Sequence, residues 1–115
     1  MPISSLEQLQ IPELEIMDMP RRMDGDTALQ IEEDILLCIQ SGAREMLLDC
    51  ANLDYVTGAG MQTFLRLARE MQAVSGKLAI CNLHPQVREM FEMCGLESMI
   101  PVYEDQAAAK FAMAA

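Results

Sequence analysis

The sequence predicts an α/β fold, in which helices pack against a small mixed, mostly parallel sheet. Two observations carry this prediction. From residue 46 onward, apolar strand-like runs alternate with amphipathic helical segments, a pattern typical of parallel strand pairing. Residues 46–50 are also nearly all apolar, as expected of a strand that is central in a sheet. With 115 residues, 51% of them hydrophobic, the chain has the length of a single domain covering residues 1–115.

The N-terminal third predicts one strand and one helix. Residues 1–12 are weakly patterned and predict at most an irregular segment or an edge strand. Residues 14–19 alternate partly between apolar and acidic side chains, as a half-buried strand does, and Pro20 ends that strand. Residues 21–27 form a polar loop that ends in good N-cap residues. Apolar residues then recur at helical spacing over residues 28–42.

The remaining elements alternate along the chain. Glycine and proline mark most of their limits, since glycine favours helix ends and proline favours helix starts. The last strand is predicted at an edge of the sheet because Pro101 has no N–H to donate. In chain order the pattern predicts a strand at 46–50, a helix at 61–71, a strand at 77–81, a helix at 85–94, a strand at 99–103 and a helix at 105–111.

The charge of the chain is strongly acidic. Eighteen acidic residues against eight basic ones give a formal net charge of −10. This charge opposes binding to nucleic acid or to an anionic membrane and favours a basic protein partner. The alternative is that the charge only keeps a small protein soluble. We find no apolar run of the roughly 20 residues needed to cross a bilayer and no signal-peptide pattern, so we expect a cytoplasmic protein.

The four cysteines are each placed inside an apolar segment. Zinc sites need close ligand pairs and disulfide scaffolds are small and loop-rich, so the spacing predicts four buried, reduced side chains. Asp24 and Asp26 flank Gly25 but lack the further oxygen ligands of a calcium loop, so no metal site is predicted.

The stretch from residue 53 to 67 is the best candidate for a functional site. A strand passes through a glycine-bearing turn into a helix, whose first N–H groups have no partners within the helix. An anion, a phosphate or a partner's side chain could be held there. The dinucleotide fingerprint is incomplete, because Thr63 stands where a third glycine is needed. The single histidine, His84, has no evident catalytic partner, so neither an enzyme nor a cofactor is predicted.

Three motifs, in order along the chain, resemble those of STAS domains, the fold of bacterial anti-sigma factor antagonists. Residues 23–28 match the family's Leu-Asp-x-x-Thr-Ala loop before its first helix. Residues 47–61 match its central strand and the loop beyond it. Residues 85–96 match its Pro-x-Val-x-x-x-Phe-x-x-x-Gly-Leu helix.

This resemblance implies a protein-docking switch and no catalysis. In the family, an anti-sigma factor that is also a kinase binds the antagonist and phosphorylates a serine before the second helix. Here that serine falls on Gly58, and Thr57, one residue earlier, is the remaining candidate acceptor. The resemblance also implies that the loop at residues 24–27 lies beside the loop at residues 57–60, at the same end of the sheet. The implied docking residues are Asp24, Gly25, Asp26, Thr27, Thr57, Gly58, Ala59, Gly60 and Met61.

The sequence is also compatible with two other functions and with a homodimer. Stand-alone STAS proteins also serve as small cytoplasmic subunits of ABC-type lipid transport systems, a role that needs no phosphoacceptor. The backbone amides of residues 57–60 could instead serve a nucleotide or small-ligand sensor. A homodimer is a further option.

Overall fold

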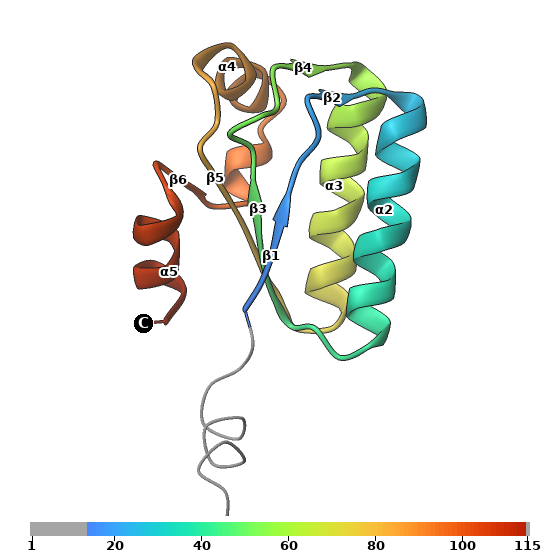
Figure 1. Ribbon diagram of the computed structural model, residues 1–115, viewed down its shortest axis with the longest axis vertical. Helices are drawn as coiled ribbons and strands as arrows, with labels where there is room; N and C mark the ends of the chain where they lie inside the picture. Colours follow the sequence, from blue (N-terminus) through green and yellow to red (C-terminus); the bar gives the residue numbers. More distant parts are fainter. Residues whose placement is uncertain (1–13, 115) are drawn as a thin grey trace, which may run out of the picture.

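The computed structural model, which describes residues 14–114, has a four-stranded sheet with helices on both faces (Figure 1). The strands are β1 (Leu14–Asp18), β3 (Glu45–Asp49), β5 (Lys77–Cys81) and β6 (Val102–Tyr103), in the order β1-β3-β5-β6. Each neighbouring pair is parallel. The predicted α/β fold is therefore confirmed, with residues 46–49 of the predicted strand 46–50 in the central strand β3. The expected N-terminal edge strand at 1–12 lies outside the described residues.

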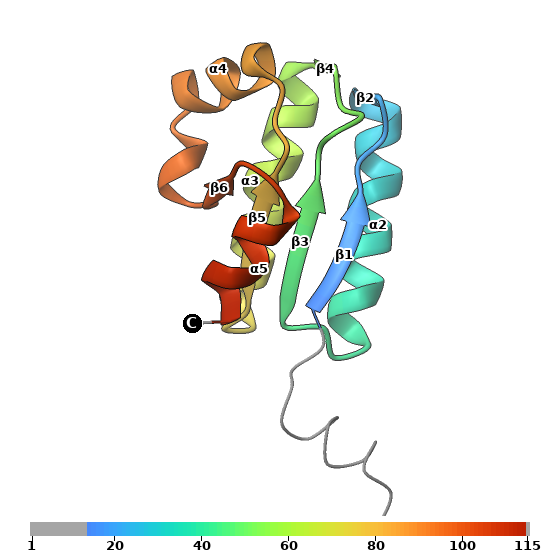
Figure 2. The same ribbon diagram turned by 60° about the vertical axis from the view of Figure 1, so that its left-hand side comes forward.

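The helices are divided between the two faces of the sheet. The long helices α2 (Gly25–Gln40) and α3 (Gly58–Ala73) lie side by side on one face, and α5 (Gln106–Ala114) covers part of the other (Figure 2). Helix α4 (Pro85–Met93) and the short 3-10 helix η1 (Leu96–Ser98) connect β5 to β6. Within residues 14–114, none of the helices has the length and apolar character that a membrane span requires.

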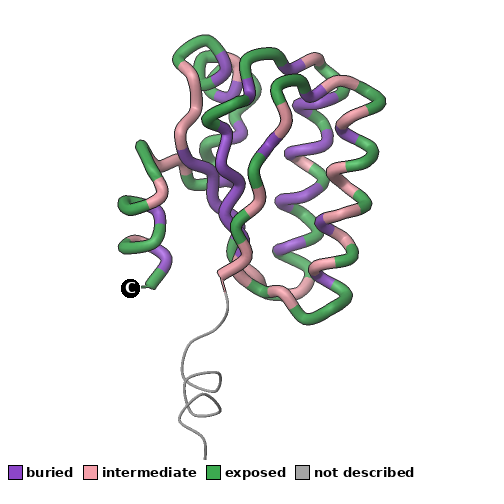
Figure 3. Tube along the Cα trace, viewed as in Figure 1, coloured by how far each residue is buried: buried purple, intermediate pink, exposed green. Residues whose placement is uncertain are grey.

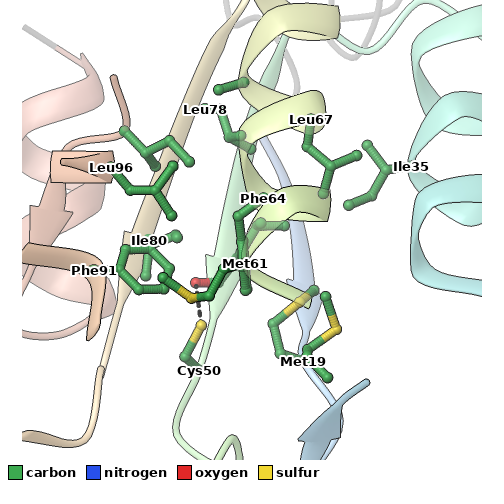
Figure 4. Packing of buried hydrophobic residues seen from close by; sticks show 14 of the residues in the cluster. Met19, Ile35, Cys50, Met61, Phe64, Leu67, Leu78, Ile80, Phe91 and Leu96 are labelled. Atoms are coloured by element: carbon green, nitrogen blue, oxygen red, sulfur yellow. Dashed lines mark hydrogen bonds between the residues drawn. The ribbon is translucent and has the colours of Figure 1, made fainter. Parts of the chain in front are cut away.

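Two hydrophobic clusters follow from the alternation of side chains along the strands. Met46 and Leu48 of β3 face α2 and α3, and they join a large cluster in which the rings of Phe64 and Phe91 meet edge to face at 5.1 Å (Figure 4). Leu47, between them, faces α5 and joins a smaller cluster. The burial pattern along the chain shows the same division, with the central strands β3 and β5 buried except at the first residue of each (Figure 3).

Several element limits differ from the sequence-based predictions. Both long helices begin three residues before the first apolar residue of their repeats, because their first turns carry no apolar repeat. The predicted strand 99–103 is reduced to β6, since the turn of η1 occupies the residues just before it. The edge position is confirmed, because β6 is the last strand in the order of the sheet. Just before β6, the Pro101 carbonyl accepts a hydrogen bond from the Ile80 amide of β5 at 2.9 Å.

The prediction of four buried cysteines is correct for two of them. Cys50 and Cys81 are buried, and burial raises the pKa of the Cys81 thiol to about 11. Cys38 is half-buried on α2. Cys94 is exposed, because the helix ends at Met93 and Cys94 forms its C-cap, turned away from the core. All four are free thiols.

Candidate functional site

A second, very small sheet joins the starts of the two long helices. Strands β2 (Arg22–Met23) and β4 (Tyr55–Val56) pair in parallel, and each leads directly into a helix (Figure 1). Residues 24–27 and 57–60 therefore lie next to each other at one end of the helical layer, as the family resemblance implied. We call residues 22–27 and 55–60 together the two-helix corner.

The start of α2 is closed by its own side chains. Asp24 is the N-cap, and its Oδ1 accepts hydrogen bonds from the amides of Asp26 and Thr27, each at 3.1 Å. The Asp24 amide donates in return to Oγ1 of Thr27 at 3.0 Å, which completes a capping box. The hydrogen bonds from the backbone and the hydroxyl of Thr27 lower the pKa of Asp24. Gly25 and Asp26 remain exposed in this first turn.

The start of α3 is closed by the Thr57 hydroxyl. Thr57 is the N-cap, and its Oγ1 accepts a hydrogen bond from the Gly60 amide at 3.2 Å. The same hydroxyl donates to the carbonyl oxygen of Met23 at 3.3 Å, and the Thr57 amide donates to that carbonyl at 2.9 Å. Oγ1 of Thr57 is therefore used both as a donor and as an acceptor, and it ties α3 to β2.

The two glycines of the α3 start have opposite surroundings. Gly58 is exposed, and a methyl group added there would meet no other atom within 4 Å. Gly60 is buried, and a methyl group added there would overlap the carbonyl oxygen of Met23. Only a residue without a side chain lets α3 approach β2 this closely. Gly60 thus fixes the geometry of the two-helix corner, whereas Gly58 leaves open space on its surface.

The residues expected to dock a partner divide between surface and core. Met61 is only 5% exposed and belongs to the large hydrophobic cluster, where it lies near Phe64 and Phe91 (Figure 4). Gly60 is buried as well. The surface of the two-helix corner retains the other seven: Asp24, Gly25, Asp26, Thr27, Thr57, Gly58 and Ala59.

The rim of the two-helix corner contains residues that were not among the implied docking residues. The guanidinium of Arg22 lies 4.8 Å from the centre of the Tyr55 ring, a cation–π contact across the small sheet. Arg21 donates to the Asp54 carboxylate at 3.2 Å beside it. Strands of two residues are too short to show an alternating pattern, so the tyrosine next to β-branched Val56 was the only local signal.

Arg66 connects helix α3 to helix α2. Its guanidinium lies 3.2 Å from the Glu32 carboxylate of α2 and donates to the Thr63 hydroxyl at 2.9 Å. Thr63 and Arg66 both belong to α3, so the contact with Glu32 is the one that joins α3 to α2.

Asp49, at the carboxyl end of β3, has a structural role. It accepts hydrogen bonds from Gln106 at 2.6 Å, Asn82 at 3.1 Å and the Ala51 amide at 3.0 Å. Burial alone would raise the pKa of Asp49, but these hydrogen bonds outweigh it and hold the pKa below its ordinary value. The carboxylate thus ties α5 to the sheet.

His84 holds a loop in the same region. Its Nε2 lies 2.7 Å from the Ala51 carbonyl oxygen, so the ring connects the start of α4 to the turn after β3. Within residues 14–114, no three His, Cys, Asp or Glu side chains are grouped closely enough to hold a metal ion.

Comparison with known proteins decides the family. The sequence profile of the STAS domain matches residues 6–109. The chain belongs to the STAS domain family. BtrV of Bordetella bronchiseptica, a STAS relative assigned to the anti-sigma factor antagonists, is 38% identical over 87 residues, which cover 76% of this chain and 75% of BtrV. The anti-sigma F factor antagonist of Paenibacillus polymyxa is 24% identical, over 76% of this chain and 68% of that protein.

Solved structures agree on the STAS fold. The anti-sigma factor antagonist SpoIIAA of Bacillus, in its unphosphorylated form, superposes with a TM-score of 0.70 at 17% identity, over 90% of this chain and 91% of SpoIIAA. The resemblance inferred from three motifs is therefore confirmed. Sequence and structure together place the chain among the anti-sigma factor antagonists.

Proposed function

We propose that this STAS protein is a cytoplasmic regulator that binds an anti-sigma factor of the serine kinase type through its two-helix corner. The family assignment and the exposed surface of Asp26, Gly58 and Ala59 support this role. The exposed side of α3 extends the same contact. Binding, and no chemical reaction, is the output of the protein.

The surroundings of Thr57 support docking without phosphorylation at the corner. The acceptor serine of the family's loop corresponds to Gly58, which has no hydroxyl. Thr57 already donates to Met23 and accepts from Gly60 through the same oxygen. A kinase would have to break both hydrogen bonds, and with them the cap of α3, to phosphorylate Oγ1. We therefore propose that Gly58 makes the protein an antagonist that its kinase cannot release by phosphorylation.

A single substitution tests this proposal. Gly58→Ser adds a hydroxyl at an exposed position where a methyl group meets no neighbour, so the fold should be retained. Both proteins are titrated with the purified anti-sigma-type kinase of the host, with and without ATP and Mg²⁺. We expect both to bind, and only Gly58→Ser to gain a phosphate, detected by mass spectrometry, and then to dissociate.

Two results would contradict the proposal. Phosphate on Thr57 of the unaltered protein would mean that the acceptor has moved by one residue, and Thr57→Ala would confirm it by losing that phosphate. Absence of binding to the kinase would remove the partner itself.

A second candidate function is a small subunit of an ABC-type lipid transport system, bound to its ATPase. The missing hydroxyl at Gly58 favours it, because such a subunit needs no phosphoacceptor. Co-purification of the chain from its host with an ABC ATPase, and without a serine kinase, would select this role. Co-purification with the kinase would reject it.

A further inference from the structure

Helix α2 presents two large apolar side chains to solvent on one stripe. Leu29 and Leu37 are 59% and 61% exposed. Residues at positions i, i+3, i+7, i+11 and i+14 share one face of a helix, so these leucines align with three polar residues. We call this set the α2 stripe: Asp26, Leu29, Glu33, Leu37 and Gln40.

The two leucines serve no packing role in the described fold. Helix α2 packs inward through other residues, with Ala28, Ile35 and Ile39 buried. Isolated exposed hydrophobic residues are common on protein surfaces. The remaining large exposed hydrophobics of residues 14–114 fit that description, since each stands alone on its element: Ile16, Tyr55, Met93 and Phe111. Helix α2 differs because its two lie on one face.

Helix α2 itself carries only negative charge, and Arg44 lies beyond its C-terminal end, where it lines a depression next to Leu37. Helix α2 contains four acidic residues and no lysine or arginine: Asp26, Glu32, Glu33 and Asp34. Glu32 is neutralised by Arg66 of α3. Glu33 lies between the two leucines and is exposed.

Leu37 also forms a wall of two shallow depressions. One of about 290 Å³ is lined by Glu33, Leu36 and Gln40. The other, of about 410 Å³, includes Glu15 and residues 41–44. Side chains of a partner could therefore be seated on both sides of Leu37.

We propose that the α2 stripe is a second docking surface, which enters an apolar groove with a lysine- or arginine-rich rim on a protein partner. Leu29 and Leu37 would be the apolar anchors, as in other complexes where a helix lies in a groove. Glu33 and Asp26 would pair with the basic rim. The stripe begins at Asp26 in the two-helix corner and runs about 16 Å along α2 to Leu37, so one partner can cover both surfaces.

The charge disfavours a second copy of the chain as the occupant. In a symmetric dimer the same patch faces itself, so Glu33 would approach Glu33 of the other copy. With a net charge of −10, two such chains repel each other. A basic partner is attracted by the same charges.

The first test uses the full chain and the purified host kinase. Its choice of the kinase as the partner rests on the proposed function. Leu29→Ala and Leu37→Ala are each expected to weaken binding about tenfold. Glu33→Lys should weaken it similarly and reduce its dependence on salt. Matched controls on α4, Met93→Ala and Glu89→Lys, alter an exposed hydrophobic and an exposed acid away from the stripe and should leave binding unchanged. If the unaltered protein binds and the stripe variants bind equally well, the inference is wrong while the proposed function stands.

A second test does not depend on the identity of the partner. A benzophenone-bearing amino acid replaces Leu37 in the full chain in host cells, and Met93 in a control. After irradiation, the inference is supported by a cross-link from position 37 to an apolar segment of another protein that contains lysine or arginine. Glu33→Lys should abolish this cross-link. If that segment belongs to a protein other than a kinase, the proposed partner is wrong and the α2 stripe is still a docking surface. No product at position 37, or a product with a second copy of the chain, overturns the inference.

Discussion

The two long helices start side by side, yet their first turns are built from different chemistry. Helix α2 begins with Asp24, Gly25, Asp26 and Thr27, and α3 begins with Thr57, Gly58, Ala59 and Gly60. Both have glycine at the first helical position. The start of α2 is closed by carboxylates and a reciprocal hydroxyl bond, whereas the start of α3 is closed by one hydroxyl and contains no acid.

This difference indicates which helix start is available to a partner. The first turn of a helix carries a partial positive charge, which an acidic group stabilises. In α2, Asp24 and Asp26 supply that group from the chain itself. In α3, an acidic group can come only from outside or from a substitution such as one at Gly58. The same comparison explains why Gly60 must be glycine: α3 is held against Met23, and α2 has no equivalent contact.

The largest expected effect comes from a substitution at the close contact between Gly60 and Met23. Gly60→Ala places a methyl group on the carbonyl of Met23, so β2 and α3 must separate. We expect the free energy of unfolding to fall by about 3 kcal/mol, as for other overpacked sites. Urea unfolding followed by circular dichroism measures it.

Gly58→Ala is the matched control for Gly60→Ala. The added methyl group at residue 58 meets open space, so the change in stability should stay within about 1 kcal/mol and should favour the folded state. Equal losses at residues 58 and 60 would show that contact with Met23 does not cause the effect.

The main strands were predictable because burial on both faces leaves an apolar run in the sequence. Residues 46–50 and 77–81 match β3 and β5 to within one residue. The small β2–β4 sheet was not predictable in this way. Each strand has two residues and gains its partner from more than 30 residues away, so neither shows a local period.

The candidate site was predictable in outline and not in its details. The family motifs placed residues 24–27 beside residues 57–60, and the structure confirms that position. Which residues reach the surface depends on the direction of each side chain. Met61 belongs to the apolar repeat of α3 and turns into the core, whereas Leu37 lies outside the apolar repeat of α2 and turns out to solvent.

The second prediction tests the uncompensated charge at the start of α3. Gly58→Asp and Gly25→Asp place an acid at the first position of each helix, where an added Cβ atom meets no neighbour within 4 Å. We expect Gly58→Asp to stabilise the protein by about 0.5 kcal/mol. Gly25→Asp should give no gain, because Asp24 and Asp26 already occupy that turn and repel a third charge.

The measurement is thermal unfolding of both variants at low and high salt, since salt screens the attraction to the helix start. A gain in both variants that survives high salt would point to loss of glycine flexibility as its cause, and the two helix starts would then be electrostatically alike.

The smallest expected effect concerns pH, because the two caps differ in whether they titrate. Hydrogen bonds from Thr27 lower the pKa of Asp24 from its ordinary value of 3.8, so its folded-state pKa lies below its unfolded-state pKa. The cap of α2 therefore contributes its full stabilisation above about pH 4 and loses it as the pH falls through the lowered value. The Thr57 hydroxyl does not titrate in this range, so the cap of α3 is insensitive to acid.

Asp24→Asn isolates this effect, because asparagine retains the acceptor oxygen of the cap and cannot titrate there. The unaltered protein should be the more stable of the two near neutral pH, and the difference in free energy of unfolding should disappear in acid. Asp49, whose pKa is also lowered, is present in both proteins, so its contribution cancels. Thr57→Ser, which alters the other cap, should show a difference that does not change with pH. If the Asp24→Asn difference is equally constant, the carboxylate does not supply the distinction between the two helix starts, and the acceptor oxygen alone closes α2.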